Sequence, residues 1–124
     1  MPQHFIGSAR MAGYQYYQWK QANKQINAGD EIILRRDPHN QHDKLAVQIL
    51  WTDPEGQQFL LGHIAVIEGQ NYGDKEPQTA AHLMDAGHTV TGKVTDKKPT
   101  SLRFDMFMAC DGEVCAYKEA VRGE

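Results

Sequence analysis

Residues 29–64 read GDEIILRRDPHNQHDKLAVQILWTDPEGQQFLLGHI, and this stretch decides the fold. Three runs in it, at 31–36, 45–51 and 58–64, are rich in β-branched and large apolar residues. Runs of this length between turn residues predict strands. The polar segment RDPHNQHD and the turn DPEG separate them. The stretch therefore predicts three consecutive strands, of which the third pairs back on the second.

The sequence outside this stretch predicts one or two short helices. A short apolar start at residues 5–6 is followed by YQYYQWKQANKQI (14–26), which is aromatic and then polar and predicts a loop with one short helix. TAAHLMDAG (79–87) places Ala80, Leu83 and Met84 on one face and predicts a helix that ends at Gly87.

Further strands are expected in the last third of the chain. HTVTGKVTD (88–96) and LRFDMFMAC (102–110) alternate with the period of a strand. Asp111-Gly112 suits a tight turn into VCAYK (114–118). About six short strands with one or two helices predict a mainly β domain, closed as a small barrel or a strongly curved sheet.

The bulk properties are those of one small globular domain. The chain has 124 residues, 40% hydrophobic and 23% charged, with a formal net charge of -3. That charge excludes a protein that coats nucleic acid by basic excess alone. No apolar run approaches the ~20 residues that span a bilayer, and no secretory signal is visible. We therefore expect a cytoplasmic protein without a membrane partner, whose Cys110 and Cys115 form no disulfide framework.

Three motifs resemble a known family when they are read together. MAGYQYY (11–17), the central block GDEIILRRDPHNQHDKLAVQI (29–49) and LGHI (61–64) occur in the order and approximate spacing of a HIRAN domain. The matching residues are Gly13, Tyr16, Tyr17, Gly29, Asp30, Arg36, Asp37, Pro38, Asn40, Asp43, Ala46, Val47, Gly62 and His63. The resemblance covers about residues 4–110, so we expect residues 1–124 to be a single HIRAN-like domain. It looks like the separate bacterial or phage kind rather than the kind fused to DNA-remodelling helicases.

The resemblance implies an OB-like barrel that captures the 3′ end of single-stranded DNA during DNA repair or processing. In that family, two aromatics hold the terminal bases, and a loop aspartate accepts a hydrogen bond from the terminal 3′ hydroxyl. Carried over by position, these roles fall on Tyr16, His42 and Asp43, with Asn40 and His63 alongside. Gln41 stands where the family usually has proline, and His42 where a larger aromatic is common.

Asp43 is also the residue with a physical argument for end recognition. A carboxylate repels internal phosphates, but it can accept a charge-assisted hydrogen bond from a free 3′ hydroxyl. The alternative is that Asp37 and Asp43 both cap amides of their own loop. We adopt that alternative for Asp37 and expect Asp43 to contact the ligand.

Four further residues complete the predicted DNA-binding set. Aromatic side chains stack on bases, although some in the segment 14–19 must belong to the core. Basic side chains on the central stretch could reach phosphates or could be solvated surface charges. The four residues are Tyr17, Arg36, Lys44 and Phe104.

Two other functions stay open at the level of the sequence. The first is a protein–protein interaction module that uses the aromatic surface, and a DNA-processing protein is one such partner. The second is a metal-assisted hydrolase; the family association suggests one acting on acid anhydrides. His39 and His42 on one loop do not meet the ligand spacing of a structural zinc site, so zinc binding is kept only as a minor alternative. No phosphate-cradling glycine loop occurs either, so we assign no catalytic residue, metal ligand or cofactor and expect a protein that is not an enzyme.

Overall fold

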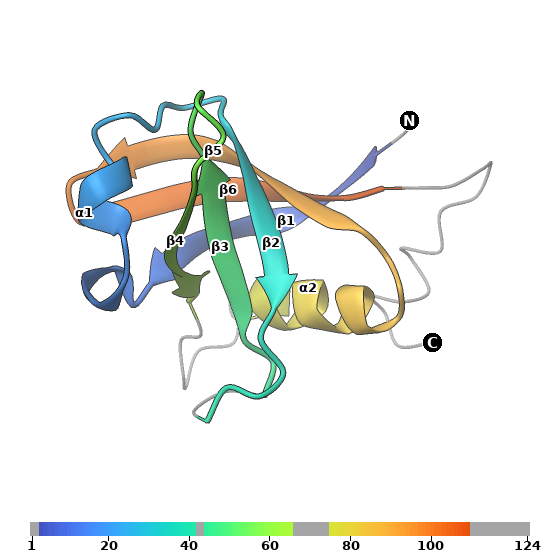
Figure 1. Ribbon diagram of the computed structural model, residues 1–124. Helices are drawn as coiled ribbons and strands as arrows, with labels where there is room; N and C mark the ends of the chain where they lie inside the picture. Colours follow the sequence, from blue (N-terminus) through green and yellow to red (C-terminus); the bar gives the residue numbers. More distant parts are fainter. Residues whose placement is uncertain (1–2, 42–43, 66–74, 110–124) are drawn as a thin grey trace.

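The computed structural model describes residues 3–41, 44–65 and 75–109 (Figure 1). Within these ranges six strands, two α-helices and one 3-10 turn follow one another along the chain. They are β1 (Gln3–Ala12), η1 (Tyr14–Tyr16), α1 (Trp19–Ala22), β2 (Glu31–Arg36), β3 (Val47–Thr52), β4 (Gln58–Ile64), α2 (Lys75–Asp85), β5 (Val90–Lys98) and β6 (Ser101–Ala109). The predicted segment VCAYK lies outside the described residues.

The six strands form a closed antiparallel barrel in the order β1-β4-β3-β2-β5-β6. The predicted mainly β, OB-like barrel is thereby confirmed, including the antiparallel pairing of β4 with β3. β1 is longer than the short apolar start suggested, at ten residues. It extends this far because its first part pairs with β6 and its last residues pair with β4, which closes the barrel.

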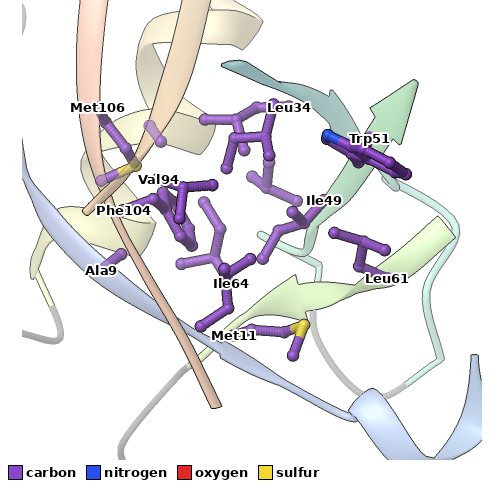
Figure 2. Close-up of a cluster of buried hydrophobic side chains, with 14 of the residues drawn as sticks. Ala9, Met11, Leu34, Ile49, Trp51, Leu61, Ile64, Val94, Phe104 and Met106 are labelled. Atoms are coloured by element: carbon purple, nitrogen blue, oxygen red, sulfur yellow. The ribbon is translucent and has the colours of Figure 1, made fainter. Parts of the chain in front are cut away.

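The inside of the barrel is filled by alternate residues of the strands (Figure 2). On β6 the alternation places Leu102, Phe104, Met106 and Met108 inside, all of them fully buried. α1 covers one end of the barrel with Trp19, whose indole Nε1 donates a hydrogen bond of 2.8 Å to the carbonyl oxygen of Pro99. The dense aromatic segment therefore supplies at least one core residue, as its composition predicted.

α2 lies beside the barrel and packs against β1, β3 and β5. It begins at Lys75, before the predicted 79–87 segment, and its residues Ala80 and Leu83 are buried. Gly87 ends it with a φ of 96°, a left-handed conformation that glycine adopts without strain. None of the helices in the described ranges is long and apolar enough to cross a membrane.

Candidate functional site

Three segments that are distant in the sequence meet on one side of the barrel. They are the turn after β1, the end of β4, and the loop 37–46 that joins β2 to β3. His63 on β4 is the centre of this meeting, since it pairs with Ala12 of β1 on one side and with Gln48 of β3 on the other. Gly13, with a φ of 75°, then turns the chain from β1 into η1.

Gly62 permits the close approach of β1 to β4 at this point. A Cβ atom at residue 62 would lie 2.5 Å from the carbonyl oxygen of Ala12 and 2.9 Å from Cγ of Met11. The carbonyl oxygen of Ala12 belongs to the backbone and cannot move aside as a flexible side chain can, so glycine is the residue that fits at this position. The Gly62-His63 pair of the sequence motif therefore has a structural reason. Gly62 allows β1 to lie against β4, and His63 is the next residue on β4.

Gln18 holds the segment after η1 against β4. Its backbone N–H donates to the carbonyl oxygen of Leu60 at 2.9 Å, and its side-chain Oε1 accepts from the Leu60 N–H at 3.0 Å. Gln18 thus pairs with Leu60 as a neighbouring strand residue would. Its neighbour Tyr17 is consequently placed beside His63, with ring centroids 5.3 Å apart and an interplanar angle of 53°.

A chain of side-chain contacts runs from Tyr17 through His63 into the loop. Nε2 of His63 lies 3.1 Å from Oδ2 of Asp37, and Nδ2 of Asn40 donates to the same oxygen at 3.1 Å. The backbone N–H of Asn40 also bonds to the carbonyl oxygen of Asp37. Side chains from three segments are therefore joined into one cluster, which we call the Tyr17–Asn40 cluster: Tyr17, Asp37, Asn40 and His63.

The carboxylate of Asp37 is ionised over a wider pH range than usual. The hydrogen bond from Asn40, followed by that from His63, lowers the pKa of Asp37 below its ordinary value of 3.8. We expected Asp37 to cap amides of its own loop, but its described side-chain bonds are to the side chains of Asn40 and His63. The residue connects the loop to β4.

Arg36 anchors the other end of the loop. Its Nη1 donates to the carbonyl oxygen of Ala46 at 2.6 Å, and its Nη2 to that of Lys44 at 2.8 Å. Its Nε lies 2.8 Å from Oδ1 of Asp85 on α2, which lowers the pKa of that carboxyl group. The guanidinium side chain is 14% exposed. In this structure Arg36 is engaged in shaping the loop, so a phosphate would have to compete with these partners.

The remaining predicted contacts fall into three groups. Lys44 is exposed on the loop. The side chain of Tyr16, and both His42 and Asp43, lie outside the described residues. Phe104 is fully buried, in contact with the core around Val94 and Ile64 (Figure 2). Its prediction as a DNA contact was wrong, because strand alternation turns the ring inward and leaves it no surface for a base.

The sequence reasoning missed two residues of the site. Gln18 carries no motif, and its strand-like pairing depends on the distant Leu60. Asp85 lies 49 residues from Arg36, on a helix whose position cannot be read from local pattern. Among the described residues, no group of three or more His, Cys, Asp or Glu side chains is arranged to hold a metal ion.

The closed barrel and the cluster on its side define a small antiparallel β-barrel domain. Residues 7–67 match the family model described as the HIRAN domain. This match confirms the resemblance that the three motifs predicted, over the segment that contains them.

Solved structures share the fold. A crystal structure of a protein from Lactobacillus plantarum has a TM-score of 0.67 at 24% identity, covering 86% of this chain and 95% of that one. A crystal structure of the HIRAN domain of human HLTF has a TM-score of 0.58 at 22% identity, covering 86% and 78%. An NMR structure of the HLTF HIRAN domain has a TM-score of 0.55 at 20% identity, covering 98% and 87%. None of the curated protein sequences compared with this chain matches it.

Proposed function

We propose that this HIRAN domain binds nucleic acid, and that its ligand is the 3′-hydroxyl end of single-stranded DNA during DNA repair or processing. HIRAN is a family of binding domains rather than catalytic ones, so we propose no reaction. The observation that carries the proposal is the Tyr17–Asn40 cluster. It joins Asp37 and Asn40 of the loop 37–46 to an aromatic pair on the neighbouring segments.

The cluster offers both an aromatic ring on which a terminal DNA base can stack and polar groups that can hydrogen-bond to it. Tyr17 is 37% exposed, and a base stacked on an aromatic ring contributes about 1–3 kcal/mol. Asn40 and His63 supply polar groups that can hydrogen-bond to a sugar or base edge. Asp43, carried over from the family resemblance, would accept the bond from the 3′ hydroxyl, with His42 as the second stacking residue.

The charges near the loop indicate that few phosphates are contacted. The charge of Arg36 is compensated by Asp85. Arg35 bonds to the neutral amide of Gln48 at 2.7 Å, so it keeps its full charge, and Lys44 is exposed. Two phosphate contacts correspond to a slope of about -1.4 for log K against log salt concentration on a single strand. A shallow dependence of this size is expected, since stacking and end contacts then supply most of the affinity.

The test compares short DNA strands that differ only at the 3′ terminus. Fluorescence anisotropy is measured for a 3′-hydroxyl and a 3′-phosphate strand at two salt concentrations. We expect tighter binding of the hydroxyl end, and loss of that preference in Asp43→Ala. Glu55→Ala is the matched control: it removes one negative charge at the turn at the opposite end of β3. Equal affinity for both ends would refute end recognition, and no binding to either would refute the nucleic-acid proposal.

Tyr17 provides a second and independent test of the site. Tyr17→Phe keeps the ring and should retain affinity within about twofold, whereas Tyr17→Ala should weaken binding by about five- to 150-fold, because it removes one stacked base. Equal affinities of the two variants would show that the ring does not contact the ligand.

A further inference from the structure

Four outward-facing residues on neighbouring strands form a continuous row around the outside of the barrel. Ile33 on β2 lies opposite Thr91 on β5. Thr91 lies in turn opposite Phe107 on β6, and Phe107 lies opposite Phe5 on β1. Directly opposite residues of antiparallel strands point to the same face of the sheet. With neighbouring strands about 4.8 Å apart, the row is about 14 Å long. We call these four residues the apolar stripe.

The two ends of the apolar stripe are exposed, its middle residues Thr91 and Phe107 are half-buried, and a hollow lies along it. Phe5 is 54% exposed and Ile33 is 47% exposed. The rings of Phe5 and Phe107 contact each other edge to face, with centroids 5.9 Å apart. A hollow of about 630 Å³ is lined in part by Ile33, Thr91 and Phe107. Contiguous apolar surface with a polar rim is typical of an interaction site rather than of ordinary protein surface.

A row of charged residues runs beside the stripe on the same face. Glu31 pairs with Lys93, and Lys93 pairs with Asp105. Asp105 pairs with Ser8, whose hydroxyl donates to its carboxylate at 2.6 Å. Among the residues that the structure describes, Glu31 and Lys93 form no ion pair. The charges therefore follow the order negative, positive, negative and polar across β2, β5, β6 and β1.

We propose that the apolar stripe is the contact surface for a second copy of this chain. A two-fold axis parallel to the strands, between β5 and β6, exchanges β2 with β1 of the partner and β5 with β6 of the partner. Ile33 of one protomer then faces Phe5 of its partner, and Thr91 faces Phe107. A two-fold contact requires a patch that is complementary to itself. The stripe meets this requirement because it has a bulky apolar residue at each end.

The charged row meets the same requirement. The two-fold operation keeps this row on its own side of the stripe, so Lys93 of one protomer comes opposite Asp105 of its partner. By symmetry this pair occurs twice. The order of charges in this row is complementary to the same row read in reverse, and a contact with a different protein would not require that property. For this reason we assign the surface to a second copy. His63 and Asp37 lie on β4 and on the loop 37–46, outside the stripe, so the inference does not rest on the proposed nucleic-acid function.

The first experiment is sedimentation velocity of the full chain over a range of protein concentrations. We expect the wild-type chain to form dimers as concentration rises. Ile33→Lys should be monomeric, since it places a charge against the apolar ring of Phe5 at both ends of the two-fold contact. Gln21→Lys introduces the same side chain at an exposed position on α1, outside the strands that carry the stripe, and should dimerise as the wild-type chain does. The proposal would be overturned if the wild-type chain stays monomeric at every protein concentration. A chain that stays monomeric and binds an unrelated protein instead would overturn it as well.

A charge exchange tests the two-fold geometry itself. In Lys93→Glu and in Asp105→Lys, like charges face each other twice, so each variant alone should have a dimer dissociation constant raised by at least about tenfold. An equimolar mixture of the two variants restores an opposite-charge pair at both positions and should dimerise with near wild-type affinity. If the mixture is as weakly associated as the separate variants, the proposed arrangement is wrong.

Discussion

Replacing Arg36 with methionine should destabilise the domain by roughly 2–4 kcal/mol. The larger part comes from the two hydrogen bonds to the carbonyl oxygens of Ala46 and Lys44, at 2.6 Å and 2.8 Å. A bond from a charged donor contributes about 1.5–3 kcal/mol, and less where it is exposed, as the bond to Lys44 is. The ion pair with Asp85 adds less than about 1 kcal/mol, because that carboxylate is 50% exposed.

Arg35 supplies the matched control, since it is the preceding residue on the same strand and carries the same charge. Its one described partner is the exposed Oε1 of Gln48, so Arg35→Met should cost less than about 1 kcal/mol. Free energies of unfolding are measured in urea for the wild-type chain and both variants. If the two substitutions are equally destabilising, the anchoring role of Arg36 is refuted. If the anchoring role holds, Arg36→Met should also weaken DNA binding, even though the charged side chain of Lys44 is still present.

Three further predictions follow from the core and the site. Phe104→Ala should cost about 3–5 kcal/mol, against less than about 1 kcal/mol for the exposed Phe5→Ala, which urea unfolding measures directly. Gly62→Ala should cost about 1–3 kcal/mol and shift the ring resonances of His63 in NMR spectra, because the added Cβ lies 2.5 Å from a backbone oxygen; unchanged stability and spectra would contradict the close approach. Asp37→Asn should lose the stabilisation of a carboxylate whose pKa is lowered in the folded state. That stabilisation is present above the unfolded pKa of 3.8 and disappears as pH falls through the lower folded value. The stability difference between wild type and Asp37→Asn should therefore be larger at about pH 6 than at about pH 3; a constant difference would exclude the effect.

Part of the candidate site could be recognised in the sequence because its residues lie in short motifs. Asn40 and His63 were predicted from the family pattern, and the structure joins them through Asp37. The role of Asp37 could not be read from its position, since a carboxylate in a turn most often bonds to nearby amides. In the folded chain β4 brings the imidazole of His63 within hydrogen-bonding distance of the Asp37 carboxylate. Phe104 shows the opposite case, in which the alternation of its own strand already indicated a buried ring.

The sequence by itself determined the β-rich class, the limits of β2 and β4 and the helix stop at Gly87, because each depends on neighbours within a few residues. The closure of the barrel depends on β1 pairing with β6 about a hundred positions away, as between Phe5 and Phe107. The Arg36–Asp85 anchor, the pairing of Gln18 with Leu60 and the apolar stripe across β2, β5, β6 and β1 likewise join residues that are far apart in the sequence. Contacts of this kind carry no local periodicity, so only the tertiary structure decided them.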